Sequence, residues 1–321
     1  MAAELENARS GKEKEKEKAA RTEKEKAAGT GIEKAQEKEK AQTQGHEKEM
    51  LIRDMTETFR GCGGNVVGED VALEGCEGLV MFEEPVFGFS SPDDGIYRKF
   101  TEKEVIGPCF MQPGEWLPGA KSVISFFLPF TERVRSSNRG APEETSPEWL
   151  HARIEGQAFL DAYTERLKEY FRDRGYEACV PATDSRFKVS PSVLPPWNRK
   201  VLHIASNWSE RHVAYASGLG TFCLTRGLIS EKGVAGRYGS IIVTEEIAPD
   251  VRTYEGVYDY CIMCGACISR CPAKAISLKH GKNQLKCRLW MKKSEKKYDP
   301  RYGCGKCQTG VPCEDRIPRR K

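Results

Sequence analysis

The 321-residue sequence lacks any long apolar segment. No run reaches the roughly 18 consecutive apolar residues that a membrane-spanning helix requires. The N-terminus also lacks the apolar core of a secretory signal and a twin-arginine pair. We therefore expect a cytoplasmic protein without a membrane partner.

The cysteines lack the spacing of a disulfide framework, although thirteen of them are present. Five are scattered singly, and we expect these to be dispensable for metal binding: Cys62, Cys76, Cys109, Cys179 and Cys223. The other eight lie after residue 260. Reduced thiols in such number predict a reducing cytosol, in an organism or niche low in oxygen.

Histidine is scarce, and its five positions show no metal-ligand spacing: His46, His151, His203, His212 and His280. We expect structural roles for all five. His212 is the one that could also line a pocket, because it follows Glu210 and Arg211 directly.

What the sequence does contain is a compact run of four cysteines at residues 261–272, spaced C-x2-C-x2-C-x3-C and followed by proline. In two-cluster ferredoxins, three thiolates at this spacing hold one [4Fe–4S] cluster and the fourth points to a second cluster. A structural zinc site is the alternative, but zinc sites usually combine two separated C-x2-C pairs. The run therefore favours iron–sulfur binding.

Four further cysteines follow this run and complete the ligand count for a second cluster. The crossover arrangement of such ferredoxins assigns one cluster to Cys261, Cys264, Cys267 and Cys313. It assigns the other to Cys271, Cys287, Cys304 and Cys307. The five residues between Cys307 and Cys313 depart from the usual spacing, so the place of Cys287 rests on the count alone.

Charge is distributed unevenly along the chain despite a net charge of only +4. Residues 1–50 carry 12 basic and 12 acidic side chains, with almost nothing apolar to bury, which is typical of disorder or a frayed helix. We expect order to begin near Met50. Residues 274–321 carry 15 Lys and Arg against 4 Asp and Glu. This basic region predicts either a docking face for an acidic electron donor or polyanion, or simple compensation of anionic clusters.

The middle of the chain alternates between apolar runs and amphipathic segments. Residues 116–130 read as a turn followed by a strand buried on both faces, and Ser146-Pro147 opens a long helix that ends at Gly175. Further strands are expected over residues 200–205 and 239–244. The alternation predicts an α/β layer structure. We divide the chain into a charged tail (1–50), an α/β cofactor domain (51–253) and a double-cluster domain (254–321).

The order of these motifs resembles that of epoxyqueuosine reductases, which are relatives of the reductive dehalogenases. The resemblance spans residues of roughly 110 to 315 and rests on the segment WLPGAKSVI at 116–124, on the two cysteine groups, and on the motifs Glu210-Arg211, Gly218-Leu219-Gly220 and Gly239-Ser240. It implies a nitroreductase-like α/β sandwich followed by a ferredoxin-like domain with two [4Fe–4S] clusters. It also implies base-off cobalamin, held near Glu210, Arg211, Gly218, Gly220, Gly239 and Ser240.

Three features depart from the family. Ala158 stands where the family has its proton-donating Asp, and Thr221 stands where a Lys follows the Gly-Leu-Gly motif. The family's tRNA-contacting helical repeats do not follow the cysteines. These departures predict a small-molecule substrate more than tRNA. The catalytic residues stay unknown, with Tyr163 and Asp161 on the long helix as weak candidates for the proton donor.

Two functions are compatible with these features. In a cobalamin-dependent reductase, electrons from ferredoxin or flavodoxin would pass through the clusters to a cofactor that reduces the substrate. The alternative is an electron-transfer or corrinoid-reactivating protein without a substrate of its own. The missing proton donor favours the alternative, whereas the large α/β domain argues for an enzyme. A flavin in the same domain is a third possibility, without a visible signature.

Overall fold

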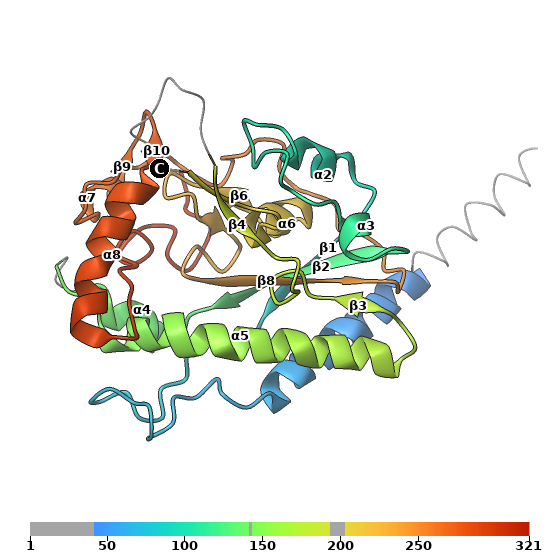
Figure 1. Cartoon of the computed structure of the whole chain (residues 1–321), viewed down its shortest axis with the longest axis horizontal. Coiled ribbons are helices and arrows are strands. Elements are labelled where there is room, and N and C mark those ends of the chain that lie inside the picture. The colour runs from blue at the N-terminus through green and yellow to red at the C-terminus, as the bar shows by residue number, and fades with distance from the viewer. Residues whose placement is uncertain (1–41, 141–142, 193–202, 321) are drawn as a thin grey trace, which may run out of the picture. The chain divides into compact units, whose positions relative to one another are not determined.

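The computed structural model describes residues 42–140, 143–192 and 203–320 (Figure 1). The chain divides into two units, Met1–Leu51 and Ile52–Lys321. In the first unit residues 42–51 are helical, and the second unit opens with residues 52–61 in helical conformation as well. The helix therefore starts before Met50, the residue near which we expected order to begin. The predictions for residues 1–41 lie outside the described residues.

The second unit is built on a four-stranded sheet with the order β1-β2-β8-β3, in which all neighbours are antiparallel. The strands are β1 (Val86–Ser90), β2 (Ser122–Pro129), β8 (Gly236–Val243) and β3 (Ala178–Cys179). Every residue of β2 is buried, which confirms the predicted strand with two covered faces. This strand pairs with β1 along one edge and with β8 along the other, so its continuous apolar run suits its central position.

Two helices position the residues discussed below: α5 (Pro147–Asp173) and α6 (Glu210–Ala216). The start of α5 has the predicted cap, because the side chain of Ser146 accepts a hydrogen bond from the backbone N–H of Trp149. Its end also agrees with the prediction, since Gly175 follows with φ of 85°. The long helix read from the sequence is confirmed in both bounds.

The two helices cover opposite faces of the sheet (Figure 1). Successive side chains of a strand point to opposite faces. Phe126 of β2 packs against Tyr163 of α5, with ring centroids 5.1 Å apart. Val123, three residues earlier, belongs to the buried cluster that includes Val213 of α6. The apolar strand is thus shared between two cores.

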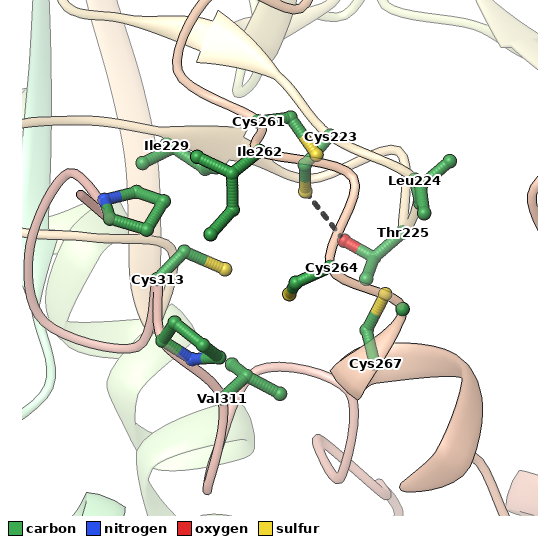
Figure 2. A pocket seen from close by; sticks show the side chains of 13 residues that line it. Cys223, Leu224, Thr225, Ile229, Cys261, Ile262, Cys264, Cys267, Val311 and Cys313 are labelled. Atoms are coloured by element: carbon green, nitrogen blue, oxygen red, sulfur yellow. Dashed lines mark hydrogen bonds between the residues drawn. The ribbon is translucent and has the colours of Figure 1, made fainter. Parts of the chain in front are cut away.

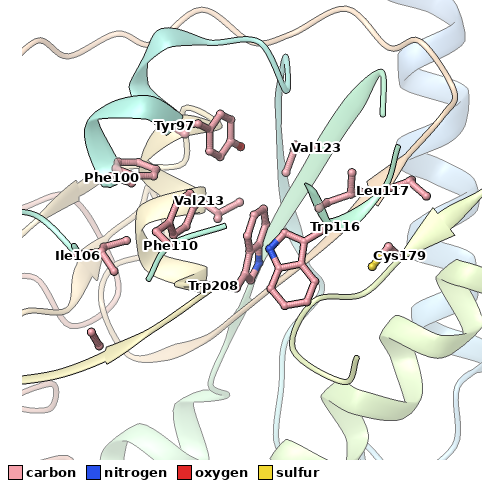
Figure 3. Close-up of a cluster of buried hydrophobic side chains, with 13 residues drawn as sticks. Tyr97, Phe100, Ile106, Phe110, Trp116, Leu117, Val123, Cys179, Trp208 and Val213 are labelled. Atoms are coloured by element: carbon pink, nitrogen blue, oxygen red, sulfur yellow. The ribbon is translucent and has the colours of Figure 1, made fainter. Parts of the chain in front are cut away.

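The core on the α6 side is largely aromatic (Figure 3). The rings of Phe110 and Trp208 stack at 5.6 Å, and Tyr97 stacks on Trp208 at 6.4 Å. Trp116 meets Trp208 edge to face at 6.1 Å. Trp208 immediately precedes the α6 cap, so this stack fixes the position where α6 begins.

Shorter elements complete the α/β part: α2 (Gly95–Phe100), α3 (Pro113–Trp116), α4 (Glu132–Ser137), and the antiparallel pairs β4 (Val189–Ser192) with β5 (His203–Ser206) and β6 (Thr221–Phe222) with β7 (Leu228–Ile229). The cysteine-rich part contains α7 (Ala266–Ser269), the pair β9 (Ile276–Ser277) and β10 (Gly281–Lys282), and α8 (Gln284–Tyr298). An α/β layer structure followed by a small ferredoxin-like region confirms the predicted fold class. Within the described residues, no helix is both long and apolar enough to cross a bilayer.

Candidate iron–sulfur centre and cofactor cavity

The first cysteine group converges on one small cavity (Figure 2). Its lining includes all four cysteines that the sequence assigned to one cluster: Cys261, Cys264, Cys267 and Cys313. Apolar side chains such as Ile229 and Val311 fill the rest of the wall. The structure therefore brings together, from segments about fifty residues apart, the ligand set expected for one [4Fe–4S] cluster.

The loop that carries three of these cysteines has an unusual backbone. Met263 adopts φ of 52° and Gly265 adopts φ of 75°, both in the left-handed region. These two turns bend the chain so that Cys261, Cys264 and Cys267 line the same cavity.

Cys223 is a fifth cysteine at this cavity, and the sequence gave no sign of it. It is buried, and its Sγ lies 3.0 Å from the hydroxyl of Thr225 and 3.4 Å from the backbone oxygen of Gly227. Figure 2 shows the contact with Thr225 as a dashed line. These partners give Cys223 a structural environment of its own beside the predicted ligands.

The second cysteine group is gathered around Lys282. Burial, together with the neighbouring thiols Cys304, Cys287 and Cys271, raises the pKa of the Cys307 thiol to about 12. Burial opposes the charge on Lys282, but Cys307 and Cys287 outweigh it and raise the pKa of this lysine. The four thiols are thus neighbours, and three of them, Cys287, Cys304 and Cys307, interact with Lys282. Iron coordination would replace their protons.

Gly305 lets the second group pack beneath α5. A Cβ atom at this position would lie 2.0 Å from Cε2 of Trp149, and the backbone has φ of 66°. The turn between Cys304 and Cys307 therefore lies directly against the first turns of α5.

Within the described residues, no three His, Cys, Asp or Glu side chains are placed to share one metal ion.

A cavity of about 600 Å³ lies between α5, α6, β8 and the second cysteine group. This volume is within the range of small-molecule and cofactor sites. Its polar and charged lining consists of Arg153, Gln157, Asp161, Thr164, Glu210, Arg211, Arg237, Tyr238, Ser240, Lys282 and Gln308. Lys282 and Gln308 connect the cavity to the second cysteine group. The sequence did not single out either residue.

Four of the six residues assigned to the cofactor line this cavity: Glu210, Arg211, Gly239 and Ser240. Gly239 is the cross-strand partner of Phe126, and a Cβ there would lie 2.5 Å from that ring. The packing of the sheet therefore requires a glycine at this point. Because Gly239 has no side chain, it also takes up no space in the cavity.

Gly218 and Gly220 lie outside the cavity lining, and the structure gives them other roles. Gly218 follows the last turn of α6 with φ of 81°, the usual position of a terminating glycine. Gly220 has φ of 155°, and a Cβ there would lie 1.9 Å from the backbone oxygen of Ile229. Both glycines shape the chain around α6 and β7.

Glu210 is held in the cavity wall by a short relay. The indole N–H of Trp208 donates to Ser240 Oγ at 2.9 Å, and Ser240 Oγ donates to Glu210 Oε2 at 2.6 Å. The other carboxyl oxygen, Oε1, is buried and has no partner among the described residues. Burial raises the pKa of Glu210 to about 8, so that the carboxyl is mainly protonated at neutral pH.

The two weak candidates for the proton donor have different positions. Tyr163 is fully buried and donates its hydroxyl to the backbone oxygen of Met55 at 3.0 Å, which is a core contact. Asp161 lines the cavity and accepts a hydrogen bond of 2.8 Å from Gln157. Ala158, where the resembling family has its Asp, is exposed.

Two of the five histidines, His151 and His212, have side-chain contacts that suit a structural role. His151 is buried, accepts the backbone N–H of Leu73 at 2.9 Å and contacts Glu155 at 3.1 Å. Burial and the adjacent Arg211 lower the pKa of His212 to about 3. His212 lies 2.8 Å from Ser209 Oγ and outside the cavity lining.

Comparison with known proteins identifies an iron–sulfur segment. Residues 254–277, which contain the four-cysteine run, match the family described as "4Fe-4S binding domain". No curated protein matches the chain.

Solved structures similar to the chain include both groups of reductases expected from the sequence. The epoxyqueuosine reductase from Streptococcus thermophilus is 17% identical with a TM-score of 0.43, over 83% of this chain and 66% of that one. That from Bacillus subtilis gives the same identity and coverage with a TM-score of 0.41. The catabolic reductive dehalogenase NpRdhA is 14% identical with a TM-score of 0.44, over 84% and 36%. The chain thus spans about two thirds or less of the length of these proteins.

Proposed function

We propose that this protein is an iron–sulfur reductase that delivers electrons into the cavity described above. Its two [4Fe–4S] clusters would be held by the two cysteine groups, and a cofactor in the cavity would pass the electrons to a small substrate. The observation that carries the proposal is Lys282, which lines the cavity and also contacts the Cys287 thiol. An electron on the second cluster is therefore next to the cavity.

Electrons would enter through the first cluster. Cys264 is exposed, whereas the other seven cysteines of the two groups are half-buried. An external donor, ferredoxin or flavodoxin, would approach at this exposed corner. The second cluster would then relay the electrons to the cavity, because its ligand Cys307 is followed directly by the lining residue Gln308.

We assign base-off cobalamin to this cavity as the proposed cofactor. When bound, it supplies a low-potential metal centre for the reduction of the substrate. The lining described by the structure contains no histidine that could act as a lower ligand. The lining side chains of Gln157 and Gln308 offer polar partners to the amide groups at the edge of a corrin ring. Gly239 has no side chain and therefore leaves space for the ring in this part of the cavity.

Glu210 would supply the proton in place of Tyr163 or Asp161. Ser240 Oγ accepts the indole N–H of Trp208, so its own hydrogen is directed to Glu210 Oε2. The carboxyl proton is then on Oε1, the oxygen without a protein partner. A neutral acid enclosed at the cavity wall can donate to a group bound in the cavity.

The alternative, an electron-transfer or corrinoid-reactivating protein, is favoured by one surface. Helix α8 carries six exposed cationic side chains: Lys286, Arg288, Lys292, Lys293, Lys296 and Lys297. Cys287, a ligand of the second group, lies on the same helix. An acidic protein partner docked on this helix would be close to the second cluster without using the cavity.

Cobalamin titration of anaerobic, cluster-loaded protein decides between the two functions. The reductase should bind cobalamin in the base-off form, with a cob(II) EPR signal that lacks nitrogen splitting. Gln157→Trp, which fills the cavity, should weaken binding by about tenfold or more, while Ala158→Trp on the exposed side of the same helix should not. Both variants should keep their iron. Absence of binding to the unaltered protein would leave the electron-transfer function.

A further inference from the structure

We infer that one wall of the cavity is a binding site for an oxyanion, a carboxylate or phosphate group, held by Arg153 and Arg237. This deepens the proposed function and rests on it, since it names the class of molecule that the cavity accepts. Six basic or carboxyl side chains line the cavity. Four are cationic, from Arg153, Arg211, Arg237 and Lys282, and two side chains are carboxyls, Asp161 and Glu210.

Neither carboxyl forms an ion pair with these cations within the described residues, although the charge of Asp161 acts on Arg237 from a distance. Glu210 bonds to Ser240, and Asp161 accepts from Gln157. Within the described part of the chain, no ion pair forms between these carboxyls and the four cations, although sixteen such pairs occur elsewhere in it, from Arg53–Asp54 to Arg316–Asp315. The cavity therefore has an excess of positive charge.

Two of the four cations have other partners. Lys282 interacts with Cys287 and Cys307 of the second cysteine group. Arg211 donates from Nη1 to the backbone oxygen of Arg226 at 2.9 Å. Arg153 and Arg237 are the two cations that lie next to each other, and within the described residues neither forms an ion pair with a carboxylate.

Arg153 and Arg237 are neighbours from different elements. Arg237 on β8 donates from Nη2 to the backbone oxygen of Arg153 on α5. The guanidinium carbon of Arg153 lies over the ring of Tyr302, 4.5 Å from its centroid. This cation–π contact limits where the guanidinium can move. Its Nε is buried and has no hydrogen-bond partner among the described residues.

A bound oxyanion would satisfy both features. Two adjacent guanidinium groups repel each other in a partly desolvated site, and a carboxylate or phosphate between them replaces that repulsion with charge-assisted hydrogen bonds. Burial and the neighbouring Arg153 lower the pKa of Arg237 to about 10, which still leaves it cationic at neutral pH. Glu210 lies in another part of the same lining, so the anchored molecule can extend toward it.

The oxyanion could belong to the substrate, as an acid group, or to the cofactor, as its phosphate. Calorimetric titration of anaerobic, cluster-loaded protein with inorganic phosphate and with benzoate tests for the site itself. We expect saturable binding that weakens by about tenfold or more in Arg153→Gln and in Arg237→Gln. Arg172→Gln, an exposed arginine near the other end of α5, is the matched control and should bind as the unaltered protein does.

The same titration with cobalamin present separates the two sources. Anion binding that persists assigns the site to the substrate. Anion binding that is lost, with cobalamin binding weakened in both arginine variants, assigns it to the cofactor phosphate. Either result supports the oxyanion site.

The inference and the proposed function fail in different ways. Cobalamin binding without any effect of the arginine variants on anion affinity would overturn the inference and leave the function standing. Anion binding that depends on both arginines, in a protein that never takes up cobalamin, would support the oxyanion site and contradict the proposed function. Where a variant does not fold, the unaltered protein still decides. Phosphate should raise its melting temperature more than chloride at equal ionic strength, and equal effects would overturn the inference.

Discussion

Ser240 Oγ donates a 2.6 Å hydrogen bond to Oε2 of Glu210, and this contact orients a neutral acid in the cavity wall. Ser240 lies on β8, and Glu210 is the first residue of α6. The strand thereby orients the helix-borne carboxyl, while Oε1 stays without a partner among the described residues. Sequence motifs Glu-Arg and Gly-Ser, thirty residues apart, are therefore two halves of one arrangement.

Glu210 should be visible as a protonated acid. Because burial raises its pKa to about 8, the carboxyl should give an infrared C=O band at pH 6 that disappears above about pH 9. Glu210→Gln should lack the band, and Asp161→Asn should retain it. A band that is absent at pH 6, or that persists in Glu210→Gln, would contradict the assignment.

The same carboxyl should make stability depend on pH. The native state binds a proton that the unfolded chain, with an ordinary pKa of 4.5, has released. Unfolding free energy should therefore fall as pH rises from about 5 to about 8. Glu210→Gln should flatten this part of the profile in anaerobic melting curves. A variant profile that parallels the original would show that Glu210 is ionised in the folded protein.

Cysteine substitutions should divide into two classes. Cys267→Ala should remove about half of the iron by opening the first cluster, and Cys307→Ala should do the same for the second. Cys223→Ala is the sharp control, because Cys223 borders the first cavity but bonds to Thr225 and Gly227. It should keep all of its iron. Loss of iron from this variant would make Cys223 a ligand.

Gly305 should be intolerant of substitution because Trp149 occupies the space for a Cβ. Overpacking and the positive φ predict that Gly305→Ala costs about 3 kcal/mol and loosens the second cluster. Gly303→Ala is the control, since Gly303 has no left-handed φ and a Cβ there would lie 3.1 Å from Cδ of Arg153, compared with 2.0 Å from Trp149 at Gly305. Melting temperature and iron content measure both effects. Equal behaviour of the two variants would contradict the packing argument.

Glu314 should be important for the first cluster through its ion pairs. Its carboxyl is 6% exposed, bonds to Arg139 at 2.7 Å and accepts the backbone N–H of Gly310 at 2.6 Å. Glu314→Gln should cost about 1.5–3 kcal/mol, because it removes, directly after Cys313, the buried, charged hydrogen-bond partner of Arg139 and of the Gly310 N–H. Glu132→Gln removes a 58% exposed partner of the same arginine and should cost about 1 kcal/mol or less. Anaerobic denaturant unfolding measures both.

Local signals in the sequence were sufficient for much of the fold. Ser146, Pro147 and Gly175 gave the bounds of α5, and the apolar run of β2 gave a doubly buried strand. These features depend on neighbouring residues, which is why they could be read without the fold.

The cavity could not be predicted in the same way. Arg153, Arg237 and Lys282 are ordinary basic residues in the sequence, on a helix, a strand and a hairpin that only the tertiary structure brings together. At Gly220 the sequence motif instead suggested a contact with the cofactor. The structure shows that glycine is needed there because a Cβ would collide with the backbone of Ile229. Long-range packing decided both cases.

The most direct test of the account is a single analysis of iron, sulfide, cobalt, flavin and zinc in anaerobically purified protein after incubation with cobalamin. We predict about eight iron and about eight sulfide per chain, with about one cobalt and no flavin. Stoichiometric zinc with little iron would contradict the cluster assignment. Full iron content with flavin in place of cobalt would contradict the assignment of the cavity.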